Sequence, residues 1–93
     1  MTAIVDPVGP TQTEVKVYPN PFSDEAVFEL EHHEYDQAKL YLFDGMGRLV
    51  REENFSGNRL NFQRNSMRDG IYFFRIESEG GALGTGKLII TGR

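Results

Sequence analysis

Hydrophobic and polar residues alternate along most of this chain. Ala26, Phe28 and Leu30 are separated by single residues, and residues 72–76 repeat the same spacing. Because successive side chains of a strand point to opposite faces of a sheet, this period of two predicts half-buried β-strands. The period of 3.6 that a helix requires is not sustained over any window of eleven residues. The predicted strands cover residues 15–18, 25–32, 37–43, 47–54, 59–63, 70–78 and 85–91.

Turn-forming residues separate the predicted strands. They are Asn20-Pro21, residues 44–47, 56–58, Asp69-Gly70 and Gly80-Gly81. Glycine and asparagine tolerate positive φ, and proline fixes φ, so each group favours a turn. Seven short strands at this spacing predict an all-β, immunoglobulin-like antiparallel β-sandwich. Greek-key strand order is expected of such a sandwich in general, but the spacing itself does not determine it.

The composition of each strand predicts its place in a sheet. Residues 40–43 and 71–74 are apolar on both faces, as expected of central strands. Residues 47–54 carry several charges, which favour an edge because charge discourages unwanted pairing. The glycine-rich stretch 80–87 is predicted to be a flexible hairpin connection. It is no phosphate loop, because it leads into a strand and not into a helix.

Residues 1–14 differ in composition from the remainder. They combine two prolines, a glycine and small polar residues, which predicts a flexible tether ahead of a compact module. Residues 15–93 then form one small domain. The first six residues also lack the basic start and apolar core of a secretion signal.

Charge and cysteine content exclude several classes of function. The formal net charge is −4, which argues against a nucleic-acid surface because phosphates require clustered Lys and Arg. The chain has no cysteine, which excludes disulfides and cysteine-ligated metal centres. Its longest apolar runs are four residues, as at 40–43, too short to span a membrane.

Residues capable of catalysis or metal binding are poorly placed. His32 and His33 are adjacent, so on a strand they would point to opposite faces and could not share a metal. Glu34 and Asp36 lack the spaced oxygen ligands and turn glycine of a calcium loop. The other carboxylates lie on predicted turns or solvent faces, and no serine has a suitably placed base. We therefore expect no enzymatic activity, no metal and no cofactor.

A group of aromatic and apolar residues leaves two interpretations open. If Tyr72 and its alternate neighbours face the core, then Ile71 and Phe73 face away, together with Tyr41 and Phe43. An exposed platform of this kind binds sugars or proteins. The alternative, which we favour from the sequence, is that the second face is covered by ordinary packing.

Four sequence blocks, in order, are distinctive. Physically, Pro19 and Pro21 end the first strand and fix φ on both sides of Asn20, and Phe22 can plug the bottom of the sandwich. The blocks are residues 17–22, 42–50, 67–76 and 86–90. In this order and spacing they resemble the type A C-terminal sorting domain of the type IX secretion system of Bacteroidetes. The resemblance runs from Val17 to Arg93. Residues 58–63 are followed by Arg64 and Arg68, which make this region more basic than the family pattern and leave the pairing of that strand open.

The resemblance implies a non-catalytic address for secretion. In this family the domain is attached to a cargo that a separate N-terminal signal has carried to the periplasm. The outer-membrane translocon recognises the domain and directs the cargo to the cell surface or the medium. A sortase-like peptidase then removes the domain and attaches the cargo to an anionic lipopolysaccharide. The missing N-terminal signal would belong to the cargo, and residues 1–14 fall where the flexible, cleaved linker from a missing N-terminal cargo would be. The resemblance thus places the candidate cleavage site in this linker, at Pro7, Val8, Gly9, Pro10 and Thr11.

The terminal strand is the predicted contact with the translocon. The residues assigned to it are Gly86, Lys87, Leu88, Ile89, Ile90 and Arg93. A free edge there would accept a partner strand by β-augmentation, and exposed edges would also allow weak self-association. The remaining motif residues are predicted to specify the fold, namely Tyr18, Pro19, Asn20, Pro21, Phe22, Asp44, Gly45, Gly47, Arg48, Gly70 and Tyr72.

Two other functions stay open at this point. One is an immunoglobulin-like adhesion or carbohydrate-binding accessory module that uses Tyr41, Phe43 and Phe73. The other is a structural spacer without a partner. A sorting domain should lose its function when the last strand is removed, whereas a binding module should bind its ligand in isolation.

Overall fold

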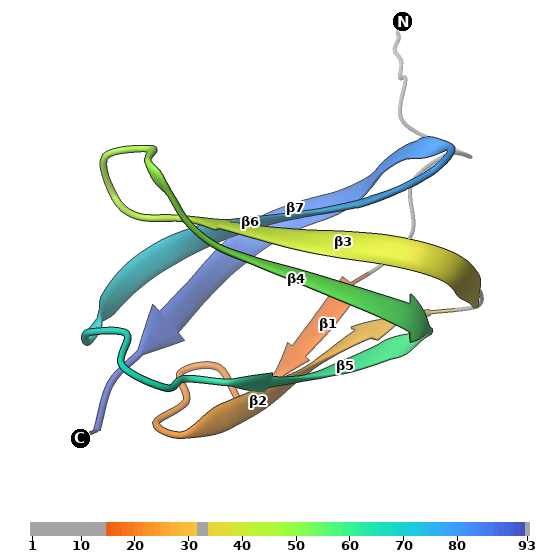
Figure 1. The fold of residues 1–93 in the computed structure, drawn as a ribbon. Helices are drawn as coiled ribbons and strands as arrows, with labels where there is room; N and C mark the ends of the chain where they lie inside the picture. Colours follow the sequence, from red (N-terminus) through yellow and green to blue (C-terminus); the bar gives the residue numbers. More distant parts are fainter. Residues whose placement is uncertain (1–14, 32–33, 93) are drawn as a thin grey trace, which may run out of the picture.

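The computed structural model describes residues 15–31 and 34–92, which form seven strands (Figure 1). The strands are β1 (Val15–Tyr18), β2 (Glu25–Leu30), β3 (Tyr35–Phe43), β4 (Leu49–Gly57), β5 (Arg59–Gln63), β6 (Gly70–Ser78) and β7 (Gly81–Ile90). Across these two ranges, no helix is long and apolar enough to cross a membrane.

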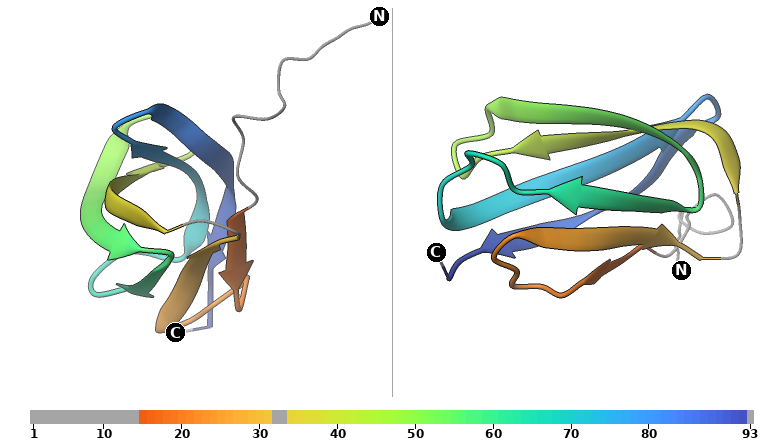
Figure 2. Two further views of the ribbon diagram at one scale, coloured as in Figure 1. Left: turned by 90° about the vertical axis from the view of Figure 1, so that its right-hand side faces the viewer. Right: turned by 60° about the horizontal axis from the view of Figure 1, so that its bottom comes forward.

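The strands build two antiparallel sheets that face each other (Figures 1 and 2). The first sheet has the order β1-β2-β5 and the second has the order β4-β3-β6-β7. The chain changes sheet between β2 and β3, between β4 and β5 and between β5 and β6, so that β2 pairs with β5 and β3 pairs with β6. The fold is the predicted immunoglobulin-like Greek-key sandwich.

The predicted positions of the strands within the sheets are confirmed. β3 and β6, which are apolar on both faces, occupy the centre of the four-stranded sheet, and the charged β4 forms one of its edges. The pairing left open by the sequence is regular, since β5 pairs with β2 from Glu25↔Gln63 to Glu29↔Arg59. The arginines that follow β5 therefore do not disturb its pairing.

The inward faces of both sheets contribute a single hydrophobic core. Phe28 lies at its centre, with its ring edge-to-face against Phe62 at 5.8 Å and Phe74 at 5.1 Å between centroids. Phe22 closes the core from the loop after β1, at 6.1 Å from Phe62. Fully burying an aromatic or aliphatic side chain stabilises a fold by about 1.5–3 kcal/mol. The buried hydrophobic residues are Phe22, Ala26, Phe28, Leu30, Ala38, Leu40, Leu42, Phe62, Tyr72, Phe74, Ile76, Leu83, Leu88 and Ile90.

Two strand boundaries differ from the sequence prediction in an informative way. β7 begins at Gly81, so most of the glycine-rich stretch is strand and not a flexible connection. Leu83 buries its side chain there, and the backbone pairs with β6 through Ser78↔Gly81 and Glu77↔Ala82. β4 begins at Leu49, because residues 44–48 form the hairpin turn between β3 and β4. The adjacent histidines at 32 and 33 lie outside the described residues.

Candidate functional site

The four sequence blocks meet at one end of the sandwich. The β3–β4 hairpin, the start of β6, the end of β7 and the loop after β1 all lie at this end (Figure 1). Phe43 at the end of β3 pairs with Phe73, and Phe73 pairs with Lys87 on β7. Phe22 forms a parallel bridge with Ile90. Residues far apart in the sequence therefore form one surface, which we call the motif end.

The first and last blocks are joined by hydrogen bonds along the outer edge of β7. The Asn20 side-chain amide donates to the Lys87 carbonyl, and the Ile89 N–H donates to Asn20 Oδ1, both at 3.0 Å. The Phe22 N–H donates to the Ile89 carbonyl at 3.0 Å, and the Thr91 N–H donates to the Phe22 carbonyl at 2.9 Å. Residues 20–22, which we call the clamp, thus act as a short parallel strand on β7.

The clamp changes the expectation of a free terminal edge. Between the Lys87 carbonyl and Thr91, the outward backbone groups of the last strand already have partners. Among the residues that the structure describes, the edge of β7 is therefore unpaired only on the N-terminal side of the clamp. Pro19 and Pro21 end β1 and carry the chain from the first sheet to the edge of the second, as the sequence predicted for the strand end. Tyr18, at the end of β1, donates its hydroxyl to Glu29, and this hydrogen bond raises the pKa of Tyr18.

The second block is a hairpin turn organised by one carboxylate. Asp44 Oδ1 accepts the backbone N–H groups of Met46 at 2.9 Å and Arg48 at 3.0 Å, and its Oδ2 pairs with the Arg48 guanidinium at 3.0 Å. Gly47 has φ of 85°, a left-handed conformation that glycine adopts without strain. The backbone N–H of Arg48, with the other donors, holds the pKa of Asp44 below its ordinary value. Gly45 lies in the same turn.

The third block forms a corner at the start of β6. The Tyr72 hydroxyl donates to the Arg68 carbonyl at 2.7 Å, which ties the strand to the loop that precedes it. Immunoglobulin-like domains use a tyrosine in this position for the same purpose. Gly70, which pairs with Ile90, begins the strand. Both residues contribute to the local structure at the start of β6.

A buried arginine, Arg64, connects two loops at the motif end, and the sequence analysis did not predict its burial. Arg64 donates to the carbonyls of Ser23 at 3.1 Å and Met67 at 2.9 Å, and it pairs with Asp69. It thereby joins the loop after β1 to the loop before β6. A single arginine after a strand carries no periodic signal, so the sequence offered no sign that this side chain would be buried.

A second arginine is also turned inward. Arg51 of the edge strand β4 lies over the Phe62 ring, with 4.3 Å between the guanidinium carbon and the ring centroid. It also pairs with Glu53 at 2.9 Å. Arg51 therefore packs against the core residue Phe62, although it lies on a charged edge strand.

The fourth block begins with Gly86, and there is no space for a side chain at this position. A Cβ built on Gly86 would lie 2.6 Å from Cζ and 2.7 Å from Cε2 of Phe74. The Phe74 ring is buried and packs against Phe28, so it lies over the position where a side chain would stand. Leu88 and Ile90 fill the core, and Lys87 and Ile89 alternate with them. Ordinary core packing therefore explains Leu88 and Ile90, the residues that point inward in this block.

The outer face of the four-stranded sheet is uncovered at the motif end. Ile71 is 52% exposed and Phe73 is 46% exposed, and the cross-strand neighbours Leu49 and Phe43 continue the apolar surface across β4 and β3. We call these four residues the end patch. The interpretation favoured from the sequence, that packing covers Ile71 and Phe73, is wrong for the described part of the chain.

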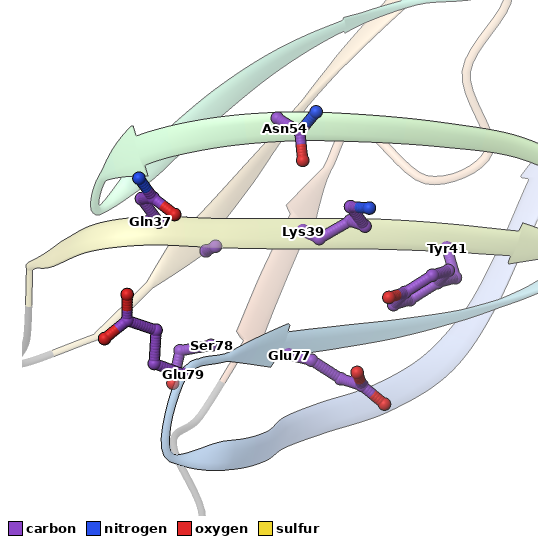
Figure 3. A pocket seen from close by; sticks show the side chains of 8 residues that line it. Gln37, Lys39, Tyr41, Asn54, Glu77, Ser78 and Glu79 are labelled. Atoms are coloured by element: carbon purple, nitrogen blue, oxygen red, sulfur yellow. The ribbon is translucent and has the colours of Figure 1, made fainter.

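The opposite end of the same outer face carries a polar hollow of about 220 Å³ (Figure 3). Gln37 and Lys39 of β3, Asn54 of β4 and Glu77 of β6 line it beside Tyr41. A sugar site would need an open aromatic face. Two cationic groups lie over the Tyr41 ring instead, Lys39 at 5.7 Å and Arg75 at 5.0 Å from its centroid. None of the four sequence blocks reaches this hollow.

Two groups of predicted residues lie outside the described residues. These are Arg93 and the candidate cleavage residues 7–11. The predicted roles of these residues therefore remain predictions.

The fold and the motif end define a small immunoglobulin-like module with one composite surface built from distant sequence blocks. The family model for secretion system C-terminal sorting domains matches residues 16–91, and the chain belongs to this family. The domain is a type IX secretion sorting signal, and its family is non-catalytic in general. Membership implies interaction with the secretion machinery and secretion of the attached protein to the cell surface or extracellular space.

Comparison with solved structures supports the fold. The chain is similar to part of dimeric latent PorU from Porphyromonas gingivalis, with a TM-score of 0.66 and 22% sequence identity. The match covers 97% of this chain and 10% of the PorU chain. A comparison with curated proteins finds no match.

Proposed function

We propose that the translocon of the type IX system recognises this domain by binding its motif end, and that the domain itself catalyses no reaction. The convergence of all four blocks at one end carries this proposal. Asn20 and Phe22 are bonded to the last strand, and Phe73 lies beside Lys87. A receptor that contacts this end therefore meets residues from every block at once.

The end patch supplies a physical basis for recognition. Exposed apolar clusters on small domains mark interaction sites. Covering a Phe or Ile side chain completely contributes about 1.5–3 kcal/mol, and Ile71 and Phe73 are each about half exposed. A partner that covers them gains about 1 kcal/mol from each. Lys87, in the same cross-strand row, adds a positive charge beside the apolar surface.

The remaining steps follow from the resemblance and the composition of the chain. The cargo would precede residues 1–14 and reach the periplasm by its own signal. The proline-containing linker, with Pro7 to Thr11, would be cut by the sortase-like peptidase, since such segments are preferred sites of proteolysis. The released cargo would then be attached to anionic lipopolysaccharide at the cell surface or pass into the medium.

The test is delivery of a reporter in a Bacteroidetes host. A fluorescent protein exported to the periplasm carries residues 1–93 at its C-terminus, and a translocon-deficient strain serves as the control. The informative variant is Ile71→Thr with Phe73→Thr, which removes apolar surface and keeps strand propensity. The matched control is Val27→Thr, on β2 in the first sheet.

Surface or medium signal from the wild-type fusion should disappear in the deficient strain. It should fall several-fold in the double variant and stay unchanged with Val27→Thr. Urea unfolding of each purified domain confirms that the variants are folded. Periplasmic retention of a folded wild-type fusion contradicts the sorting function, whereas full delivery of the double variant contradicts recognition through the end patch.

A further inference from the structure

One segment of the outer edge of β7 has no neighbouring strand in the sheet. Ile89 directs both its N–H and its C=O outward, to Asn20 and Phe22. In an antiparallel ladder this direction alternates by residue, and the pairing with β6 is unbroken from Gly70↔Ile90 to Ile76↔Gly84. Thr85 is four residues before Ile89, so both of its backbone groups point outward as well. β7 is the last strand of its sheet, and the clamp reaches back only to the Lys87 carbonyl.

The other sheet edges are protected, and this segment is not. β4 carries three consecutive charges at residues 51–53, β1 carries Lys16, and β5 carries Arg59. Charge or proline on an edge is the usual device against unwanted pairing. Residues 81–86 of β7 have neither. Within residues 15–31 and 34–92, one stretch of strand edge is thus left without a partner strand, beside the residues of the last motif.

A hollow of about 540 Å³ lies on the outer face next to this open edge. It is lined by Phe43, Phe73, Phe74, Arg75, Thr85, Gly86 and Lys87. The aromatic residues come from β3 and β6, and Lys87 closes the side next to the clamp. Arg75 pairs with Glu77 at 2.9 Å, whereas Lys87 forms no ion pair with any residue that the structure describes. The hollow therefore combines apolar walls with one available positive charge.

We propose that a strand from a protein of the secretion machinery pairs with β7 between Leu83 and Lys87. The unpaired backbone of Thr85 specifies an extended peptide as the occupant, because only a strand satisfies both groups in the plane of the sheet. Alternate side chains of an added strand face the hollow. The one opposite Thr85 is apolar and packs against Phe73, and the one opposite Lys87 is a carboxylate. The clamp ends the available edge and so fixes the register of the added strand. The inference rests on the proposed sorting function and names the contact by which it acts.

The decisive variant is Thr85→Pro in the same reporter fusion. Proline removes the outward N–H and its ring obstructs an added strand, but edge strands tolerate it where the N–H faces solvent. The matched control is Asn54→Pro on β4, the opposite edge of the same sheet, where the alternation also directs the N–H outward. Delivery should fall about tenfold with Thr85→Pro, equivalent to about 1.4 kcal/mol of binding free energy, and stay at the wild-type level with Asn54→Pro.

A second pair of variants keeps the backbone intact if proline proves to unfold the domain. Lys87→Glu should lower delivery several-fold by opposing the partner carboxylate. Arg59→Glu makes the same charge change on β5, in the other sheet, and should leave delivery unchanged. Urea unfolding of the purified domains decides which pair is informative.

Three results overturn the inference. Wild-type delivery by a folded Thr85→Pro fusion does so directly, as does an equal effect of Lys87→Glu and Arg59→Glu. A dimer of the wild-type domain in sedimentation equilibrium that Thr85→Pro abolishes would assign the edge to a second copy of this chain. Failure of the wild-type fusion itself to reach the surface is a separate outcome, since it refutes the sorting function and with it this contact.

Discussion

Replacing Gly86 with alanine should destabilise the domain, although alanine usually stabilises a strand relative to glycine. The new Cβ would lie 2.6 Å from the tip of the Phe74 ring. That ring is buried and stands edge-to-face against Phe28, 5.1 Å away, so it cannot swing aside without displacing a second ring. The perturbation is therefore overpacking of a core that is already filled.

The expected magnitude follows from two opposing effects. Overpacking a well-packed core destabilises by about 1–3 kcal/mol. The loss of glycine flexibility in the unfolded chain stabilises by about 0.4–1 kcal/mol. The net loss of unfolding free energy should be about 1–2 kcal/mol, which lowers the urea midpoint by about 0.5–1 M for a domain of this size. Gly45→Ala is the matched control, because nothing lies within 4 Å of a Cβ at that position and its φ is not positive.

Urea unfolding followed by far-ultraviolet circular dichroism measures both variants. Gly45→Ala should leave the midpoint unchanged or raise it. Combining Gly86→Ala with Phe74→Leu should cost less than the sum of the two single changes, by about 0.5–3 kcal/mol, because the smaller side chain vacates the contested space. A Gly86→Ala domain as stable as wild type would refute the steric argument, and so would strict additivity in the double variant.

Three further results are expected. Asn20→Ala should destabilise by about 1–2 kcal/mol through two lost hydrogen bonds and should speed amide exchange at Ile89, measurable by NMR. The N–H groups of Arg48 hold the pKa of Asp44 in the folded state below its ordinary value of 3.8. Above pH 3.8, the titration of Asp44 should therefore not change the free energy of unfolding. It should then decline as the pH falls through the folded pKa, and Asp44→Ala should flatten the decline. Arg64→Lys should lose about 2 kcal/mol in urea unfolding, because one ammonium cannot replace the planar fork that joins two loops.

The strand pattern was predictable because burial on one face imposes a period of two. β1, β5 and β6 have the predicted boundaries, and the others differ at their ends. β7 illustrates the limit, since residues 81–86 consist largely of glycine and small residues. A strand at a sheet edge needs only backbone pairing and an occasional buried side chain such as Leu83, and neither leaves a periodic signal.

The site could be predicted only in part for a related reason. Turn chemistry marks local structure, so the roles of Pro19, Asp44 and Gly47 were accessible from the sequence. The clamp was not, because the bonds of Asn20 to the last strand span 67 and 69 residues. The exposure of Phe73 could not be predicted from the sequence either. An apolar residue on the second face of a strand gives the same sequence pattern whether that face is packed or exposed.

The clamp also determines which experiments can separate folding from recognition. Removing the chain after Gly84 deletes Leu88 and Ile90 from the core and leaves Asn20 and Phe22 without their backbone partners. Loss of delivery after such a truncation would follow from unfolding alone, whatever the translocon contacts. A folded composite surface differs from a linear signal in one testable respect, namely that outward substitutions in any block should impair it. The outward residues of β6 and β7 can be changed without touching the core, so variants there report on recognition itself.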